Sequence, residues 1–414
     1  MPVSHNTLNY FNNLFQPVRQ SRPFRYLWLG QLFSVLGSSI SMVILPMVVY
    51  ALTGSKVVMG TVMAVYMLPY VLMLPVAGLM VDRMNRIGVM VAADAVRCVM
   101  MLGMMFLLLQ DRMTLPLLYS FMAVYGFMEG LFQPAYSAMR ARVFTPDIRN
   151  AANALTQVSH QGVRLLGPAI GGLLISYVSA GVGYGIDAIT YLISLCCLWF
   201  IRDLGTKRLI KSKIGWKSDL ATGFIILKGH PWLWITIAVF SVLNIFFSGI
   251  VLILVPWLFK IHHGFTPFLY GLGVTFAGVG GVIAALLFGS RTSWRKRGWL
   301  AYGGVIISGV ALLFLPFVAW GPGLVALMAV EGFGMMLFGL VWETSLQELV
   351  PEEAFGRVAS IDLLGSFALL PLGYLAVGGL ADWIGGQATM VLLALGGLLI
   401  AACALWVPAI RNFD

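Results

Sequence analysis

Hydrophobic residues in this chain form long runs that are separated by short polar stretches. Twelve of the runs reach roughly 20 residues, the length that an α-helix needs to cross the hydrocarbon core of a bilayer. The predicted spans are residues 26–51, 57–81, 88–110, 114–139, 151–178, 183–201, 232–259, 268–289, 299–320, 322–348, 358–383 and 388–408. The pattern therefore predicts an all-α integral membrane protein with twelve transmembrane helices.

The amino-acid composition agrees with this pattern. Of the 414 residues, 60% are hydrophobic and only 10% are charged, whereas soluble domains are about half apolar and about a quarter charged. The net charge of +10 does not indicate a nucleic-acid-binding protein, because the basic residues lie mainly between the hydrophobic runs. The four cysteines fall inside predicted spans without metal-ligand spacing, so we expect no disulfide framework, no metal and no cofactor.

The distribution of Lys and Arg predicts the orientation in the membrane. If the N-terminus is cytoplasmic, the inner connections hold 21 of the 26 Lys and Arg residues and the outer connections hold 3. The positive-inside rule places the more basic connections in the cytoplasm. We therefore expect both termini to be cytoplasmic.

The longest polar connection divides the predicted spans into six and six. This predicts an N-terminal six-helix bundle at residues 1–201, a cytoplasmic linker at 202–231 and a C-terminal six-helix bundle at 232–414. Apolar residues at helical spacing near the end of the linker indicate a short helix on the inner membrane surface. An ordinary solvated linker is the alternative.

The two halves repeat local patterns. Gly78 ends the second predicted span and is followed by VDRMNR, and Gly289 ends the eighth and is followed by RTSWRKR. Thr145-Pro146-Asp147 after the fourth span is echoed by Val350-Pro351-Glu352 after the tenth. Duplicated six-helix units are typical of secondary transporters, whose substrate site lies between the halves near the membrane midplane.

Two motifs give the chain a resemblance to the major facilitator superfamily over nearly its whole length. Residues 78–86, GLMVDRMNR, are similar to the superfamily's loop 2–3 motif G-x-L-x-D-R-x-G-R, with Asn85 where the family usually has Gly. Residues 167–172, GPAIGG, are similar to the fifth-helix motif of drug and metabolite antiporters. The runs at 132–135 and 145–147 resemble the drug:proton antiporter-3 group, which includes macrolide efflux proteins and the enterobactin exporter.

The resemblance implies two conformational elements. The first is a cytoplasmic latch, in which acidic and basic side chains pair with a neighbouring helix end or with lipid phosphates. Its predicted members are Gly78, Asp82, Arg83, Arg86 and Asp362. The second is a mobile fifth helix, in which a proline breaks the backbone hydrogen bonding and glycines let another helix approach. Its predicted members are Gly162, Gly167, Pro168, Gly171 and Gly172. A solvated positive-inside loop is the alternative to the latch.

Charged residues inside the spans indicate the coupling chemistry. Glu129 and Glu331 lie mid-span in the fourth and tenth helices, which line the cavity in the superfamily. A carboxyl group in an apolar wall retains its proton more readily than in water, as coupling to a proton gradient requires. Arg164, on the polar side of the fifth helix, is the predicted competitor for the charge of Glu129. The alternative is that Glu129 and Arg164 form a structural pair.

The remaining intramembrane charges suggest structural roles. Asp94 and Arg97, three residues apart on the third span, are expected to pair with each other. Asp187 and Asp382 are expected near the outer ends of their spans, where a charge costs little. The fourth-helix Arg motif of other drug antiporters is not matched, because Gly126 holds that place.

Polar, aromatic and methionine side chains on the predicted cavity helices form the expected substrate site, because soft surfaces repack around varied apolar ligands. The residues are Gln31, Ser38, Tyr125, Phe132, Tyr136, Phe240, Asn244, Phe247, Met328, Met335, Phe338 and Trp342.

These patterns favour a secondary active efflux transporter of the bacterial inner membrane. We expect a monomer that exchanges protons for an amphipathic drug or secreted metabolite by alternating access, in contact with membrane lipids. A lipid flippase, with Arg164 facing a headgroup, and a nutrient uptake transporter are the alternatives. A membrane-embedded enzyme is not expected, because no residues sit at catalytic spacing and no Gly-rich loop suits a nucleotide.

Overall fold

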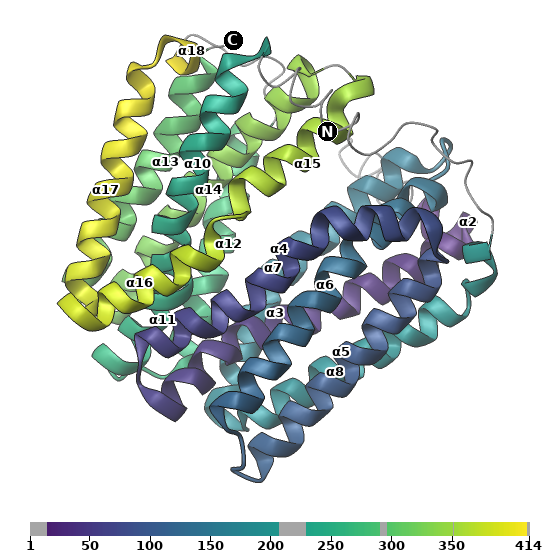
Figure 1. The fold of residues 1–414 in the computed structure, drawn as a ribbon, viewed down its shortest axis with the longest axis horizontal. Coiled ribbons are helices and arrows are strands. Elements are labelled where there is room, and N and C mark those ends of the chain that lie inside the picture. The colour runs from purple at the N-terminus through teal and green to yellow at the C-terminus, as the bar shows by residue number, and fades with distance from the viewer. Residues whose placement is uncertain (1–14, 207–228, 290–295, 351, 412–414) are drawn as a thin grey trace, which may run out of the picture. The chain divides into compact units, whose positions relative to one another are not determined.

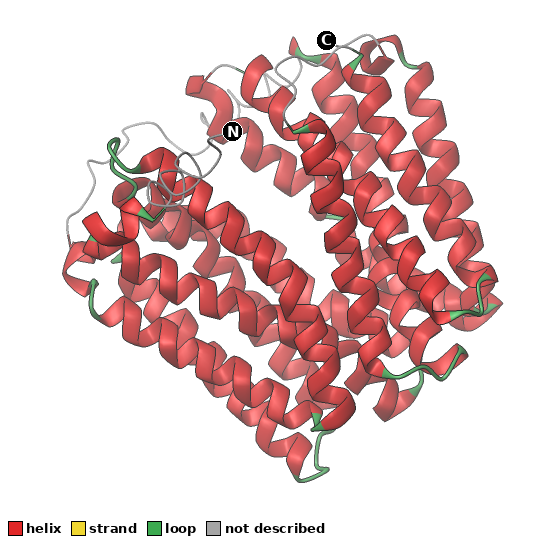
Figure 2. Cartoon of the chain, turned by 180° about the vertical axis from the view of Figure 1, so that it is seen from behind, coloured by secondary structure: helices red, strands yellow, loops and turns green. Residues whose placement is uncertain are grey.

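The computed structural model describes residues 15–206, 229–289, 296–350 and 352–411. Within these ranges the chain is helical, and no β-strand is formed (Figure 2). Eleven of the described helices are long and apolar enough to cross a membrane. The predicted all-α membrane fold is confirmed at this level, while the orientation of the termini stays a prediction.

The chain forms two compact units. The first comprises Met1–Ile44 and Leu68–Lys211, and the second comprises Leu45–Met67 and Ser212–Asp414. The helices up to residue 206 are α2 (Gln16–Gln20), α3 (Arg22–Thr53), α4 (Lys56–Arg83), α5 (Arg86–Leu109), α6 (Leu115–Val143), α7 (Arg149–Tyr177), α8 (Ala180–Trp199) and the 3-10 turn η1 (Arg202–Thr206).

In the first unit, α5 packs along α8 and against α6 (Figure 1). Asn85 begins α5 as its N-cap, and its side chain accepts a hydrogen bond of 3.1 Å from the backbone N–H of Gly88. An Asn at this position satisfies one of the free N–H groups of the first helical turn. This accounts for an Asn at the place where the superfamily motif usually has Gly.

The second unit contains the remaining helices. They are α10 (Pro231–Gly249), the π-helical turn η2 (Ile250–Leu254), α11 (Val255–Trp257), the π-helical turn η3 (Leu258–His262), α12 (Pro267–Phe288), α13 (Arg297–Phe314), the 3-10 turn η4 (Leu315–Phe317), α14 (Gly321–Leu349), α15 (Glu352–Phe367), α16 (Leu370–Ile384), α17 (Gly386–Trp406) and α18 (Pro408–Arg411). Here α14 packs extensively against α12 and α13, and α13 also packs against α17.

Glycines bring the backbones of α12 and α14 into direct contact. A Cβ at Gly332 would overlap the carbonyl oxygen of Ala277, and a Cβ at Gly280 would overlap that of Ala329. Gly339 is on the same helix as Gly332, but a Cβ there would meet nothing within 4 Å. Small residues at such contacts allow the close helix packing that stabilises membrane bundles.

We expect Gly332→Ala to destabilise the protein, because the added methyl group can be accommodated only by separating the two helices. The expected loss is about 1–3 kcal/mol, the usual cost of overpacking. Gly339→Ala is the matched control and should be neutral or slightly stabilising, since Ala is the better helix former. Thermal unfolding of the two purified variants in detergent measures the difference. Equal unfolding temperatures would contradict the close contact.

The adjoining ends of α3 and α4 belong to the second unit. Tyr50 donates a hydrogen bond of 2.6 Å to the carbonyl oxygen of Ile253. Lys56 forms an ion pair of 3.1 Å with Asp382, and its ammonium group lies 5.1 Å from the centre of the Trp257 ring. The predicted domain boundaries at 201 and 232 stay a prediction. The contacts show in addition that residues 45–67 pack with the C-terminal part.

Three local departures from the predicted spans have physical reasons. The α7 helix is not among the eleven strongly apolar helices, although it has 29 residues, because polar side chains dilute its apolar surface. Two π-helical turns flank Pro256 in the seventh predicted span, where the proline lacks an N–H donor. The eleventh predicted span is divided into α15 and α16, just before Pro371. The predicted surface helix of the linker lies in residues 207–228, outside the described part.

Candidate functional site

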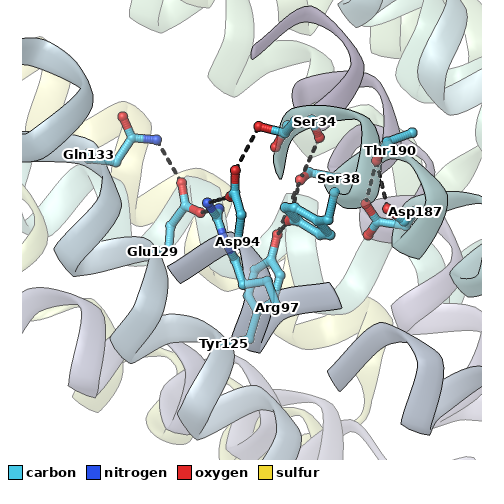
Figure 3. A network of polar contacts seen from close by, with 11 residues as sticks. Ser34, Ser38, Asp94, Arg97, Tyr125, Glu129, Gln133, Asp187 and Thr190 are labelled. Carbon is cyan, nitrogen blue, oxygen red and sulfur yellow. Dashed lines mark hydrogen bonds and ion pairs between the residues drawn. The ribbon is translucent and has the colours of Figure 1, made fainter. Parts of the chain in front are cut away.

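A buried ionic cluster in the first unit joins α5, α6 and α8 (Figure 3). The guanidinium group of Arg97 donates to one oxygen of Asp94 and, at 2.5 Å, to Oε2 of Glu129. The other Asp94 oxygen accepts a bond of 2.6 Å from Ser194, and Oε1 of Glu129 accepts one of 2.6 Å from Gln133. One cation therefore holds two carboxyl groups, each of which has a second donor.

Aromatic rings enclose the cation of this cluster. The guanidinium carbon of Arg97 lies 4.3 Å from the centre of the Phe132 ring and 4.8 Å from that of Tyr191. The side chain of Arg97 is 2% exposed and that of Asp94 is 0% exposed, while Glu129 is 17% exposed. Glu129 is thus the more exposed of the two carboxyl groups. Desolvated rings of this kind attract a cation by about 2 kcal/mol.

Three hydroxyl groups form a triangle beside the cluster. Tyr125 and Tyr191 lie 2.9 Å apart at their hydroxyl oxygens, and Ser38 Oγ lies 3.2 Å and 3.0 Å from them. Tyr125 is one helical turn from Glu129 on α6, and Tyr191 covers Arg97. The triangle therefore extends the polar network from α5 and α6 to α3.

The structure corrects the predicted partner of Glu129. Its partner is Arg97 and not Arg164, whose side chain is exposed on α7. Helical rotation decides this outcome, because α5 presents Arg97 to Glu129 on α6 and Asp94 to Ser194 on α8. The expected Asp94–Arg97 pair is confirmed, and it is part of a larger cluster.

The fifth-helix glycines make the close contact that was expected of them. A Cβ at Gly167 would overlap the side chain of Ser39, and a Cβ at Gly171 would lie 2.8 Å from the carbonyl oxygen of Ile40. Pro168 lies inside α7 and is buried, as is Gly172. Gly162 does not take part, since a Cβ there would meet nothing within 4 Å. Mobility of this helix stays a prediction.

Asp187 is buried, which was not expected, while its depth along the span stays a prediction. It was predicted near the outer end of its span, where a charge costs little, but it is 0% exposed in the first unit. Its Oδ2 accepts a hydrogen bond of 2.5 Å from Ser41 on α3, and its Oδ1 lies 3.4 Å from Thr190 Oγ1. Depth along a helix and burial on a helix face are separate properties, and hydropathy predicts only the first.

The second unit contains a cavity of about 180 Å³ beside Glu331. The carboxyl group of Glu331 is buried, and its Oε1 accepts a long hydrogen bond of 3.4 Å from Ser308. No Lys, Arg or His of the described ranges lies within 4.0 Å of it. The lining residues are Phe240, Leu243, Asn244, Phe247, Ser248, Val251, Leu252, Glu331 and Met335. Five of the predicted site residues, including Glu331, are thereby brought together.

Other predicted cavity residues of the second unit form a buried aromatic stack. Phe240 stacks on Phe338 with ring centres 3.8 Å apart, and Phe338 stacks on Trp342 at 6.0 Å. Met328 is also buried. Asp362 accepts a hydrogen bond of 3.1 Å from Trp342 Nε1. This aromatic stack forms one side of the cavity through Phe240.

Predicted residues of the first unit are distributed over its core. Phe132 and Tyr136 are buried and stack on each other with ring centres 6.0 Å apart, and Gln31 is buried as well. Their role as cavity lining stays a prediction. The latch is also untested, because the side chains of residues 75–83 lie outside the described part, and with them Gly78, Asp82 and Arg83.

Sequence reasoning missed Tyr191 and Ser194 of α8, and it named Asp187 without its contacts. Each forms a hydrogen bond with a different helix of the first unit: Asp187 with Ser41 on α3, Tyr191 with Tyr125 on α6, and Ser194 with Asp94 on α5. They follow one another at i, i+4 and i+7, which places them on one face of a helix. This spacing inside an apolar span was the available signal.

A family model for the Major Facilitator Superfamily matches residues 27–368. The chain belongs to the Major Facilitator Superfamily. The superfamily consists of transporters, and this member is a multi-pass protein of the bacterial cell membrane.

Relatives within the superfamily include named efflux proteins. The chain is 24% identical over 409 residues to the multidrug efflux pump Tap of Mycolicibacterium fortuitum, covering 95% of this chain and 97% of that protein. It is 23% identical over 397 residues to macrolide efflux protein A of Streptococcus pyogenes, covering 94% and 96%. An uncharacterized MFS-type transporter of Bacillus subtilis, YfiS, is 26% identical over 399 residues, covering 92% of each. The predicted resemblance to the drug-efflux group is confirmed.

Solved structures of other transporters share the fold. A POT family transporter in complex with a thioalcohol-conjugated peptide matches with a TM-score of 0.74 at 12% identity, covering 94% of this chain and 97% of that chain. The peptide transporter POT in complex with sulfate matches with a TM-score of 0.72 at 14% identity, covering 94% and 95%. Identities this low show the fold alone.

Proposed function

We propose that this transporter exports cationic amphipathic compounds in exchange for protons. The observation that carries the proposal is the sharing of Arg97 by two carboxyl groups, the buried Asp94 and the half-buried Glu129. One guanidinium group neutralises one carboxylate. The second carboxyl group is therefore ionised only at the cost of an unbalanced charge in an apolar interior, which a bound proton removes.

Glu129 is the member of the cluster assigned to proton exchange. It is 17% exposed, whereas Asp94 is 0% exposed, so it is the carboxyl group of the pair that we assign to contact with water. With a proton on Glu129, the Arg97–Asp94 pair is neutral and retains the bond from Ser194. When the proton leaves, Arg97 and Gln133 both donate to the new carboxylate. The ionised form thus has both donors in place, and the O–H of the protonated form can donate to the amide oxygen of Gln133 once that amide group turns over.

The cavity beside Glu331 is assigned to part of the substrate. An alkylammonium group of the substrate would be the charge partner that an ionised Glu331 lacks among the described residues, and the aromatic and methionine neighbours of Glu331 would also attract it. The volume of about 180 Å³ is below the range of about 300–1,000 Å³ for pockets that hold whole drug-sized ligands. It therefore fits the charged end of a larger amphipathic molecule. Exchange of one proton for one monovalent cation is electroneutral.

We also propose transport by alternating access. In this proposal α7 spans the membrane too, which brings the number of spanning helices to twelve, and α7 moves during transport. In this proposal the Lys56–Asp382 ion pair breaks and re-forms when the adjoining ends of α3 and α4 move. The flippase alternative relied on the charge of Arg164, whose side chain is exposed on α7 and does not contribute to the Arg97 cluster. Efflux relatives support export over uptake.

Reconstitution tests the proposal directly. Purified protein in inverted orientation should accumulate ethidium or a macrolide inside liposomes whose lumen is acidic, because protons then leave as substrate enters. Each coupled proton supports about tenfold accumulation per pH unit, since one unit corresponds to about 1.36 kcal/mol. Nigericin, which collapses the pH gradient, should abolish this accumulation. Equilibration without accumulation would show facilitated diffusion and contradict proton antiport.

We expect Glu331→Gln to weaken transport of cationic probes while retaining proton coupling. Loss of the carboxylate removes an ion pair but leaves the shape of the cavity, so the KM for ethidium should rise by about tenfold, for a loss of roughly 1.5 kcal/mol. An uncharged probe of similar size should be affected little. A matched control is Glu343→Gln, on the same helix but outside the cavity lining. Equal losses for charged and uncharged probes would contradict a charge-recognising role.

A further inference from the structure

Arg164 is a charged side chain that the proposed mechanism leaves without a role. It lies midway along α7, is exposed, and forms no hydrogen bond or ion pair with any residue that the structure describes. A charge in the middle of a membrane is costly unless it faces water or a polar partner. With α7 spanning the membrane, as proposed, the space in front of Arg164 is therefore polar and is not filled by lipid chains.

Arg164 is the last member of an open polar strip on one face of α7. The members of this strip follow one another at i, i+4, i+7 and i+11, and they are Asn153, Gln157, His160 and Arg164. Three of them are exposed and His160 is half-buried. The same face continues with Gly167 and Gly171, where the missing side chains let α3 pack against α7. The strip is thus open as far as Arg164 and closed by α3 directly beyond it.

The strip offers positive charge and hydrogen-bond donors without a carboxylate. Arg140 on α6 reaches the beginning of the strip, where its guanidinium group donates to Asn153 Oδ1 at 3.1 Å. The Nε atom of Arg140 is buried and has no hydrogen-bond partner within the described ranges. No Asp or Glu of the described residues lies within 4.0 Å of the guanidinium nitrogens of Arg140 or Arg164. The positive charge of the strip therefore has no anionic partner in this part of the chain.

A carboxylate or phosphate group is the ligand that fits this arrangement. The guanidinium group of Arg164 has five N–H donors and no acceptor, and its planar shape matches two oxygens of such a group. His160 and Gln157 add donors about 6 Å and about 10 Å further along the helix axis, at 1.5 Å per residue. An anionic group at Arg164 would therefore find several donors on the same helix face.

We infer that the polar strip of α7 binds the anionic group of a transported compound, with Arg164 in direct contact. This extends the substrates from cations to zwitterionic amphiphiles, which carry a carboxylate or phosphate group beside the ammonium group. The transport of such compounds rests on the proposed proton antiport, whereas their binding does not. A phospholipid headgroup offers the same phosphate chemistry, so drug and lipid are separate arms of the test.

Two probes that differ only in the anionic group test the binding. Norfloxacin is a zwitterion with a carboxylate, and its methyl ester keeps the ammonium group without the negative charge. Arg164→Gln should raise the Kd of norfloxacin about tenfold, as expected for the loss of one charge-assisted contact, and leave the Kd of the ester unchanged. Arg164→Lys keeps the charge without the planar fork and should lose only part of the affinity. Equilibrium dialysis of the purified variants measures each Kd.

The matched control is Arg112→Gln, which removes an exposed arginine from the turn after α5 in the same unit. This variant should bind both probes like the wild type. An unchanged Kd of norfloxacin in Arg164→Gln, or no binding of norfloxacin by the wild type, would overturn the anion site. Equal losses of affinity for norfloxacin and its ester would also overturn it, because they would show that Arg164 acts through the structure of α7.

Liposomes with an acidic lumen test the transport of the zwitterion. The wild type should accumulate norfloxacin, and Arg164→Gln should slow the uptake of norfloxacin but not that of ethidium. Displacement of bound norfloxacin by dioctanoyl phosphatidylglycerol, without any uptake of norfloxacin, would assign the strip to lipid headgroups and overturn its role in transport. A wild type without pH-driven uptake of ethidium would overturn the antiport, while the difference in Kd between the two probes would still stand.

Discussion

Glu129→Gln should abolish proton-driven accumulation of substrate while sparing passive exchange. Gln retains the size of the side chain, its amide oxygen can accept from Arg97, and its NH2 group can donate to Gln133 once the Gln133 amide turns over, but Gln cannot gain or lose a proton. The plateau of ethidium uptake should therefore fall from about tenfold per pH unit to no accumulation at any pH gradient. Exchange of labelled for unlabelled ethidium at uniform pH should continue, because it requires binding and conformational change alone.

A suitable control also loses an Arg–carboxylate contact. Glu348 pairs with Arg297 at 2.5 Å and is 44% exposed in the second unit, so Glu348→Gln disrupts an ion pair outside the cluster. This variant should accumulate ethidium like the wild type. If Glu129→Gln still concentrates substrate when a pH gradient is imposed, Glu129 is not the coupling residue, and Glu331 becomes the next carboxyl group to test.

The helices of this protein could be predicted from the sequence because hydrophobic length alone determines them. Only local chemistry altered the prediction: Pro371 follows the break between α15 and α16, and Pro256 accompanies two π-helical turns. The polar face of α7 lowered its apolar character, although Gly167 and Gly171 were correctly expected to contact another helix. Spacing along one helix therefore predicts the faces of that helix well.

The partners of the charged residues could not be predicted in the same way. Glu129 had two arginines within reach, Arg97 and Arg164, and the choice depends on the rotation of α5 and α7 about their axes. A rotation of 100° for each residue moves a side chain from one neighbour to another. The burial of Asp187 likewise follows from the packing of α3 on α8 at Gly37. Such contacts depend on how the helices pack against one another, which the pattern along a single sequence does not specify.

Arg97→Met should destabilise the protein more than any other single substitution considered. The change leaves Asp94 and Glu129 buried without their shared cation, and breaking a buried ion pair costs about 3–5 kcal/mol. Lys56→Met is the comparison, because the Lys56–Asp382 pair is 15% and 37% exposed and such pairs contribute only about 0–1 kcal/mol. Thermal unfolding in detergent should show a large loss for Arg97→Met and a small one for Lys56→Met.

Removing the whole cluster should restore most of this stability without restoring function. In the triple variant Asp94→Asn, Arg97→Met, Glu129→Gln, no charge remains without a partner, and neutral replacement of a buried ionic group is often close to neutral in stability. The triple variant should therefore unfold near the wild-type temperature and exchange ethidium, but accumulate none at any pH gradient. Accumulation by the triple variant would exclude the cluster from coupling. A triple variant as unstable as Arg97→Met would show that Arg97 acts through its packing between Phe132 and Tyr191 and not through its charge.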